Sequence, residues 1–292
     1  MKDLFNALQE TFMYKFNIEL AGEMVTVQAH TPHDAKEAGV NDWSLRVLQR
    51  IPDMQKQRHY ISALYDALLQ AGVVNAYAPS VAAASALIID SEDLTTRFNF
   101  GRTRLHRNSD MPADGVFIEP GEAFVFTAAG CPSIVAKSKT QGKKFTCVAH
   151  AGRASLIDEG ILRNSPTRSY MSIVDAIVRE FKLRDVPPSE VHMALILAIP
   201  QRVFDHPLDD PKYSDHNRKL LALVNEKWPG SMSCEGNHAY LSIPEVFIQQ
   251  ARSLGVKEAW AASDMDAFPE LTHTRDGGNP LRRNLVIIKN DA

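Results

Sequence analysis

A cysteine and a histidine stand at the ends of two neighbouring apolar runs in the middle of this sequence. The first run closes on Gly130 and Cys131, and the second closes on His150, with Gly152 two residues further on. A thiolate and an imidazole are the side chains that most often form a nucleophile–base pair or a soft metal site. The glycines beside them leave room for a ligand. The alternative is a half-buried cysteine next to a structural histidine, so the pattern is a hypothesis that the fold must support.

Strand-like segments surround both residues and would position them. Apolar runs occupy residues 115–118, 123–128, 133–136 and 145–150, and glycine-containing turns separate several of them. We expect pairing of these strands to bring Cys131 and His150 together. Cys147 lies three residues before His150, so the alternation of side chains along a strand places it on the opposite face, in the core.

The remaining pattern predicts an α+β fold, with a central mixed sheet flanked by helices. Helical spacing of apolar residues covers 4–12, 61–69, 220–228 and 244–254, and Ser172 with Asp175 forms a capping box that opens another helix. Alternation at 16–20 and 24–28 predicts a hairpin, and the apolar runs 191–199 and 285–288 predict further strands. Helices do not follow strands regularly, which favours α+β over an alternating architecture.

A basic segment precedes the cysteine and histidine runs, between residues 95 and 112. Its cationic and imidazole side chains are Arg97, Arg102, Arg104, His106 and Arg107. A cluster of this kind is usually the solvated face of a loop. Beside the cysteine and histidine it would instead be suited to an anion.

Composition limits the classes of function. The chain has 292 residues and a net charge of −3, which argues against broad electrostatic binding to nucleic acid. No apolar stretch has the length of a membrane span, and the polar residues near the N-terminus do not fit a secretory signal. Three cysteines do not make a disulfide framework. We therefore expect a cytoplasmic protein that binds a small molecule and neither nucleic acid nor a membrane.

Several common catalytic motifs are absent, among them a glycine-rich dinucleotide loop, a phosphate loop, a zincin helix and a paired Cys-x-x-Cys. The remaining candidates are His106, Cys131, Cys147, His150 and His273. Two histidines and one cysteine around Zn²⁺ would leave a fourth position open, as a catalytic zinc requires. Without a metal, Cys131 and His150 would form a thiolate–imidazolium pair. Spacing leaves both possibilities open, and the other histidines, which are scattered, are interpreted as structural or exposed.

The segment from residue 113 to residue 152 resembles the laccase-domain, or polyphenol oxidase, family of bacterial proteins. That family carries Ala-Asp-Ala/Gly, then Thr-Ala-Asp-Cys-x-Pro, then His-Ala-Gly-Trp-Arg-Gly. The corresponding residues here are Ala113-Asp114-Gly115, Thr127-Ala128-Ala129-Gly130-Cys131-Pro132 and His150-Ala151-Gly152-Arg153. The C-terminal segments His273-Thr274-Arg275-Asp276-Gly277-Gly278 and Arg283-Asn284-Leu285-Val286-Ile287-Ile288 resemble the end of the family. The resemblance spans residues 95–289, and residues 1–92 match poorly.

The resemblance implies a purine-nucleoside-processing enzyme with a zinc site, either a purine nucleoside phosphorylase, which is a transferase, or a nucleoside deaminase, which is a hydrolase. Under it, His106, Cys131 and His150 would hold zinc, and Arg153 would be catalytic. His273, Arg275 and Arg283 would bind the substrates, a nucleoside and phosphate. It also implies a catalytic core over residues 93–292, with residues 1–92 as an N-terminal extension packed on that core.

The sequence departs from the family pattern at three points. Aligned without a gap, Gly130 occupies the place of the family cysteine and Cys131 follows it. The family's first histidine, in a Gln-Val-His-Gly motif, has His106 as its nearest counterpart. The tryptophan of the His-Ala-Gly-Trp-Arg-Gly motif is absent.

A second resemblance points to a different hydrolytic chemistry. The laccase-domain fold is similar to that of cysteine–histidine glutamine deamidases, which have a Gly-x-Cys-type turn and a histidine one strand later. Gly130-Cys131 and His150 resemble that pattern as well. This implies a metal-independent amidohydrolase, or deamidase, as the alternative enzyme. A binding module that has lost its metal is the non-enzymatic alternative.

Overall fold

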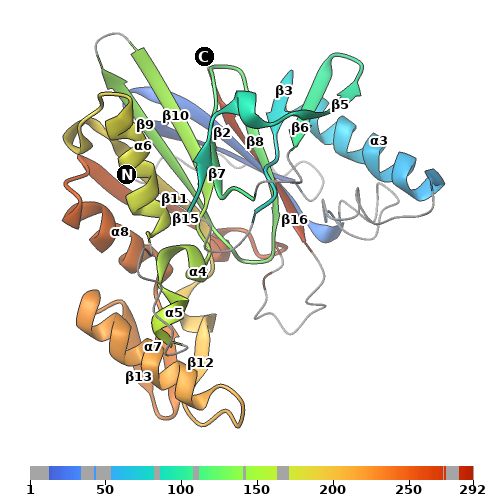
Figure 1. Ribbon diagram of the computed structural model, residues 1–292. Coiled ribbons are helices and arrows are strands. Elements are labelled where there is room, and N and C mark those ends of the chain that lie inside the picture. Colours follow the sequence, from blue (N-terminus) through green and yellow to red (C-terminus); the bar gives the residue numbers. More distant parts are fainter. Residues whose placement is uncertain are drawn as a thin grey trace.

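The computed structural model describes residues 13–33, 43, 54–81, 86–107, 112–140, 143–162, 171–271, 273 and 283–291. They form two large mixed β-sheets that face each other, a small third sheet, and helices on the outer faces (Figure 1). Four short 3₁₀ turns lie between these elements, η1 Ser91–Asp93, η2 Pro188–Glu190, η3 Gln201–Val203 and η4 Met265–Ala267. The α+β class with mixed sheets flanked by helices is confirmed. The single central sheet of the prediction is two sheets in the structure.

The first large sheet has seven strands and joins residues from both ends of the chain. In spatial order they are β1 Met13–Leu20, β2 Glu23–His30, β16 Asn284–Asn290, β8 Ala123–Ala128, β3 Asn75–Tyr77, β6 Thr103–Arg107 and β5 Thr96–Phe100. β3 runs parallel to β8 and β6, and the other neighbours are antiparallel. The proposed boundary at residue 92 therefore has strands of this one sheet on both sides of it.

The second large sheet has six strands and contains Cys147 and His150, both on β10 Lys143–His150. Its spatial order is β15 Glu258–Asp264, β11 His192–Ala198, β9 Ser133–Thr140, β10, β7 Gly115–Phe117 and β4 Ile88–Ile89. The third sheet consists of β12 Asp205–Pro207, β14 His238–Leu241 and β13 Met232–Glu235. With α7 Ser214–Lys227 it forms a lobe below the two large sheets in Figure 1, which we call the small lobe.

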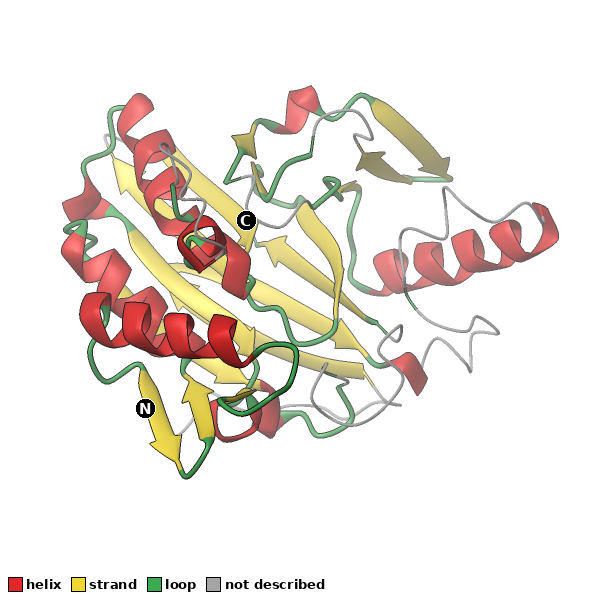
Figure 2. Ribbon diagram, turned by 60° about the horizontal axis from the view of Figure 1, so that its bottom comes forward, coloured by secondary structure: helices red, strands yellow, loops and turns green. Residues whose placement is uncertain are grey.

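Helices cover the outer faces of the two sheets and complete a four-layer arrangement. α3 Met54–Gln70 packs on the seven-stranded sheet, and α6 Ile173–Leu183 and α8 Ile243–Ser253 lie over the six-stranded sheet (Figure 2). The short helices α4 Arg153–Leu156 and α5 Glu159–Leu162 lead from β10 towards the small lobe.

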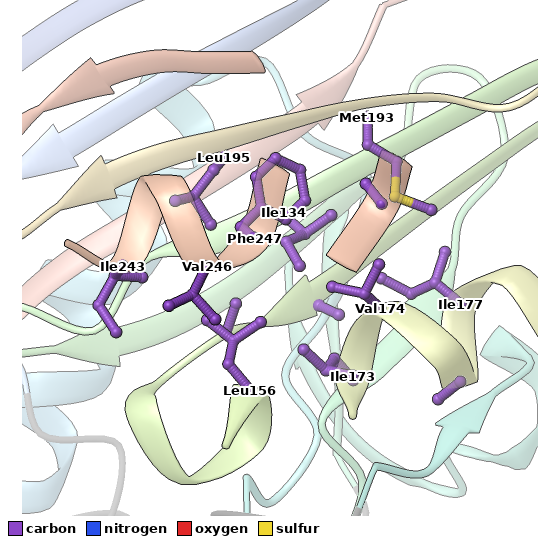
Figure 3. Close-up of a cluster of buried hydrophobic side chains, with 14 of the residues drawn as sticks. Ile134, Leu156, Ile173, Val174, Ile177, Met193, Leu195, Ile243, Val246 and Phe247 are labelled. Atoms are coloured by element: carbon purple, nitrogen blue, oxygen red, sulfur yellow. The ribbon is translucent and has the colours of Figure 1, made fainter. Parts of the chain in front are cut away.

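Three apolar clusters hold the layers together by removing apolar surface from water. The first lies between the six-stranded sheet and its helices, where Ile134 and Leu195 meet Val174 and Phe247 (Figure 3). A second fills the space between the two sheets, and a third lies under α3. The strands β8, β11 and β16 are therefore buried on both faces, which explains the continuous apolar runs of the sequence.

Local sequence signals account for the elements whose ends were predicted. Ala21 and Gly22 both have positive φ, as a two-residue hairpin turn between β1 and β2 requires. Ser172 and Asp175 form the predicted capping box at the start of α6. α8 begins with Pro244 in its first turn and ends before Gly255, which has a φ of +77°.

The basic segment differs from its prediction. Residues expected to be an exposed loop form the β5–β6 hairpin, and His106 and Arg107 are buried in it. Arg102 and Arg104 are exposed. Alternation holds at the start of β6, where Arg104 is exposed between the buried Thr103 and Leu105, but at the end of the strand both faces are covered and His106 and Arg107 are buried together. The predicted helix at 4–12 lies outside the described residues.

Within the described ranges, none of the helices has both the length and the apolar character needed to span a membrane.

Candidate active site

A crossing between the two large sheets brings Cys131 beside His150. β8 belongs to the seven-stranded sheet and ends at Ala128, and β9 begins at Ser133 in the six-stranded sheet. Cys131 lies in the link between them, directly after Gly130, whose φ of +94° favours glycine. His150 ends β10 and pairs with Ser133 in the β9–β10 hairpin. The two runs named in the sequence are therefore not paired with each other, and the strand after Cys131 makes the connection.

The two side chains are in direct contact, which confirms the predicted pair. The thiol of Cys131 and the imidazole of His150 are hydrogen-bonded. Gly152 lies against both. A Cβ atom added at Gly152 would lie 3.0 Å from Nε2 of His150 and 3.4 Å from Sγ of Cys131. The edge of the ring that carries Nε2 thus faces the cysteine, and His150 itself is only 7% exposed.

A buried carboxylate stands at the other edge of the His150 ring. Oδ1 of Asp114 lies 3.6 Å from Nδ1 of His150, and Asp114 is fully buried. The other carboxylate oxygen accepts a hydrogen bond of 2.7 Å from the backbone N–H of Ala86. The backbone N–H of His150 donates to the carbonyl oxygen of Asp114 at 2.7 Å. Cys131 and Asp114 therefore lie at opposite edges of the His150 ring, an array that would suit a nucleophile, a base and an orienting acid.

This array favours the charged form of both reacting groups. Burial opposes protonation of His150, but the Asp114 carboxylate 3.6 Å away and the Cys131 thiol outweigh it and raise its pKa to about 9. Burial also opposes ionisation of Cys131. The hydrogen bond to His150 and the charges of His150, Arg283 and Arg153 outweigh it and lower the pKa of the thiol. Both shifts favour a thiolate–imidazolium pair beside the carboxylate of Asp114.

The other two cysteines have different environments. Cys147 is fully buried in the cluster under α6, as predicted, and burial raises the pKa of its thiol well above the ordinary value. Cys234 is exposed on β13. None of the three is in a disulfide bond.

The structure places three of the four predicted cationic and imidazole groups near this array. Arg153 follows Gly152 and begins α4, and its charge acts on Cys131 together with that of Arg283. His273 packs against the turn before the cysteine, because a Cβ atom at Gly130 would lie 3.0 Å from its Cβ. Arg275 lies outside the described residues.

His106, the third candidate zinc ligand, lies elsewhere. It pairs with Tyr77 in the seven-stranded sheet, and Tyr77 in turn pairs with Phe124 near the start of β8. The imidazole stacks on the Tyr77 ring, with centroids 4.9 Å apart. Cys131 follows the opposite end of β8. The structure therefore brings Cys131 and His150 together without His106.

The described residues do not fit the zinc ion that the resemblance implies. A catalytic zinc needs three protein ligands, and only Cys131 and His150 of the proposed three meet. In the ranges that the structure describes, no three side chains among His, Cys, Asp and Glu are arranged to hold a metal. The chemistry that these residues support is that of a thiolate and an imidazolium.

Two residues of the site were not identified from the sequence. Asp114 was recognised only as part of the Ala-Asp-Gly segment, without a role. The sequence feature that could have indicated a role is an acidic residue directly before a strand-like run. A carboxylate buried at such a position is rarely left without a partner. The second is His206, which was set aside with the scattered histidines. Its ring nitrogen Nε2 lies 3.1 Å from Nη1 of Arg153.

Comparison with known proteins shows the fold but not a close relative. No model of a protein family matches the sequence, and no curated protein matches it.

Three solved structures are similar over almost the whole chain. YlmD from Geobacillus stearothermophilus has a TM-score of 0.64 and 16% identity, and the match covers 98% of this chain and 99% of the YlmD chain. The Neisseria meningitidis protein NMB0706, of family DUF152, has a TM-score of 0.60, 14% identity and coverages of 95% and 99%. The Bacillus licheniformis hypothetical protein YfiH has a TM-score of 0.60, 14% identity and coverages of 91% and 92%.

Proposed function

We propose that this protein is a metal-independent cysteine amidohydrolase that deamidates a carboxamide. The chain has the fold of the YfiH-like proteins, so the fold implied by the laccase-domain resemblance is confirmed, and it extends through the N-terminal region that matched poorly in sequence. The observation that carries the proposal is the array in which His150 hydrogen-bonds to the Cys131 thiol while its other ring nitrogen faces the buried Asp114. A fold alone does not determine a reaction, so the proposal rests on these three side chains.

In the first half of the reaction, the thiolate of Cys131 attacks the carbonyl carbon of the amide. A carbon–sulfur bond forms, and the electron pair of the carbonyl moves onto oxygen. When the tetrahedral intermediate collapses, the carbon–nitrogen bond breaks. The His150 imidazolium gives its proton to the leaving nitrogen, so that ammonia departs and a thioester to Cys131 remains.

In the second half, the neutral imidazole accepts a proton from water. The resulting oxygen nucleophile attacks the thioester carbon, and the carbon–sulfur bond breaks. The products are a carboxylic acid and the original thiolate–imidazolium pair. Asp114 keeps the ring orientation and stabilises the imidazolium in both halves, without taking the proton itself.

The test is ammonia release by metal-free protein. The substrates are small carboxamides and short peptides that contain glutamine or asparagine, in buffer with EDTA. We expect turnover that Cys131→Ala abolishes, by about 10³-fold or more. Cys234→Ala is the matched control, because that thiol is exposed on the small lobe and should be dispensable.

A trapped intermediate makes the test specific. Rapid acid quenching followed by mass spectrometry should find the acyl group of the substrate on the peptide that contains Cys131. Ammonia release that survives Cys131→Ala, or an acyl group found elsewhere, would contradict the proposal. Zinc analysis of the same preparation adds a second criterion, because stoichiometric zinc that is required for turnover would also contradict it.

Purine nucleoside processing is the second candidate function. Two observations favour it: the laccase-domain fold, and the positive charges of Arg153 and Arg283 beside Cys131, which suit a phosphate co-substrate. The measurement is release of free purine from adenosine, inosine and guanosine, with and without phosphate. Phosphate-dependent release without any amidase activity would favour this function over the first.

A further inference from the structure

The small lobe reaches the active site through one buried histidine. His206 lies on β12, is 1% exposed, and packs edge-on against Phe204 with ring centroids 4.8 Å apart. Nδ1 of His206 lies 3.0 Å from the backbone carbonyl oxygen of Phe204, and Nε2 lies 3.1 Å from Nη1 of Arg153. A side chain from the third sheet therefore contacts Arg153, which follows Gly152 in the chain.

The two contacts define what His206 does. A carbonyl oxygen only accepts hydrogen bonds, so the ring must carry its proton on Nδ1. In the neutral ring, Nε2 is then an acceptor, and the guanidinium of Arg153 donates to it. The arrangement makes His206 a fixed acceptor for the Arg153 side chain.

The backbone of Arg153 is also fixed. Arg153 opens α4, and the carbonyl oxygen of Leu156 at the end of that helix accepts a 2.6 Å hydrogen bond from Nε2 of Gln250 on α8. Gln250 is buried. An arginine side chain loses much rotamer freedom when it binds a ligand, and holding both its backbone and its guanidinium beforehand reduces that cost.

The charge of the held guanidinium acts on the nucleophile, Cys131. Gly152, the neighbour of Arg153 in the chain, touches both Cys131 and His150. Arg283 adds a second positive charge that acts on Cys131. Asp114, the carboxylate of the array, is fully buried on the other side of the His150 ring. The side of the site that carries Arg153 therefore favours an anion.

We propose that Arg153, held in place by His206, recognises an anionic group of the substrate, a carboxylate or a phosphate, next to the bond that Cys131 attacks. The substrate class rests on the proposed amidohydrolase function, and the anion site itself does not. His206 is a positioning residue, because it acts only through Arg153. Arginine suits this role because its planar fork matches the geometry of both anions.

The test compares two alkylating agents that differ in charge. Iodoacetate is an anion and iodoacetamide is neutral, and both react with the same thiolate of Cys131. The ratio of their rate constants at one pH therefore does not depend on how much thiolate is present. We expect this ratio to exceed that of glutathione, and to fall by about tenfold in Arg153→Met at low ionic strength.

Variants of His206 test the positioning role. His206→Phe keeps an aromatic ring against Phe204 but removes the acceptor, and should lower the ratio several-fold. Adding it to Arg153→Met should lower the ratio no further, because both act through one guanidinium. His206→Gln restores an acceptor and should recover part of the ratio. His238→Phe, in the neighbouring strand β14, is the matched control and should leave it unchanged.

The outcomes separate this proposal from the function. A ratio that Arg153→Met leaves unchanged overturns the anion site, and a ratio lowered by Arg153→Met but not by His206→Phe overturns the positioning role. Neither result depends on ammonia release. The iodoacetamide rate and the thermal midpoint of each variant show that it is folded. Protection of Cys131 from iodoacetamide by acetate or by inorganic phosphate, at equal ionic strength, distinguishes a carboxylate from a phosphate.

Discussion

Asp114, just before β7, and His150, at the end of β10, face each other across 3.6 Å between Oδ1 and Nδ1. Asp114 immediately precedes β7, and Gly115 pairs with Ala149 in β10, so the backbone register itself places the carboxylate beside the ring. A hydrogen bond between the His150 N–H and the Asp114 carbonyl reinforces that register. The orientation of the imidazole is thus built into the sheet, and Cys131 meets a ring whose position is already determined.

Asp114→Asn is expected to impair this array without unfolding it. The asparagine keeps an oxygen that can accept from the Ala86 N–H, but it loses the charge that stabilises the imidazolium. The pKa of His150 should fall from about 9, and turnover should fall by about 10²- to 10⁴-fold. The pH profile of Cys131 alkylation measures the change, because loss of the imidazolium raises the pKa of the thiol and moves the profile to higher pH.

Asp175→Asn is a suitable control, because Asp175 belongs to the capping box of α6 and not to the site. It should lower stability slightly and leave the alkylation profile in place. An Asp114→Asn protein with the wild-type profile would show that the carboxylate has no influence on the pair.

Alanine at Gly152 should slow the alkylation of Cys131 with little effect on stability, whereas alanine at Gly115 should lower stability. Gly152 has a φ of −64°, which alanine adopts without strain, but the new Cβ would lie 3.0 Å from the His150 ring. Gly152→Ala should therefore displace the ring by a few tenths of an ångström and slow Cys131 alkylation, with little change in the free energy of unfolding. Gly115→Ala would place a Cβ 2.6 Å from the Ala149 Cβ and 2.9 Å from a backbone oxygen.

That second clash lies within the sheet and cannot be relieved by a flexible side chain. Gly115→Ala should cost about 1–3 kcal/mol of stability, as overpacking of a core does. Thermal unfolding and alkylation rates on both variants check the pair. A Gly152→Ala protein that alkylates at the wild-type rate would mean that the His150 ring has more space than the structure shows.

Local patterns in the sequence predicted much of this fold. The β1–β2 hairpin, the capping box of α6 and the ends of α8 each depend on residues a few positions apart, and each was predicted correctly. Contact between Cys131 and His150 was also predicted, because both sit at ends of strand-like runs. The reason was incomplete, since β8 and β10 belong to different sheets.

Long-range relationships were not predictable in the same way. Asp114 is placed beside His150 only by the pairing of β7 with β10, and no local sequence pattern predicts that pairing. His206 meets Arg153 only because the small lobe folds back below the six-stranded sheet. The β5–β6 hairpin was missed because its arginines were interpreted as a loop, whereas β6 exposes Arg104 and buries Leu105, His106 and Arg107.

Two variants of the ion pair between Lys137 and Glu23 should lose different amounts of stability, because only one of them leaves a buried charge without its partner. Lys137 on β9 is 1% exposed, and its Nζ lies 3.1 Å from Oε2 of Glu23, which also binds Lys144 at 2.8 Å. Glu23→Gln leaves the Lys137 ammonium buried beside a neutral group, and should cost about 3 kcal/mol. Lys137→Met removes the charge and keeps the volume, and should change stability by about 1 kcal/mol or less. Urea unfolding of both variants at pH 7 gives the comparison, and equal losses would contradict it.

A buried histidine should make the protein sensitive to mild acid. His30 on β2 is 4% exposed, and its ring lies against Trp43 with centroids 5.8 Å apart. Among the described residues, Nε2 of His30 has no hydrogen-bond partner. Burial therefore penalises the charged ring and lowers its pKa from 6.5 to about 4.

Mild acid destabilises the protein through His30 because the unfolded chain binds a proton on this ring more readily than the native state does. Above pH 6.5 the ring is neutral in both states and has no effect on the pH dependence. As the pH falls from 6.5 towards 4, the unfolded chain takes up the proton and the native state does not, so stability is lost over that window. The loss attributable to His30 is about 3 kcal/mol at pH 4.

His30→Leu should remove this part of the acid sensitivity. Urea unfolding of wild type and variant at pH 7, 5 and 4 measures it. The difference in unfolding free energy between the two proteins should grow in favour of the variant as the pH falls. Other titrating groups cancel in that difference, because both proteins contain them. His59→Leu, at an exposed position on α3, is the control and should follow the wild type. A His30→Leu protein whose stability falls in parallel with the wild type would show that the buried ring is protonated at no cost.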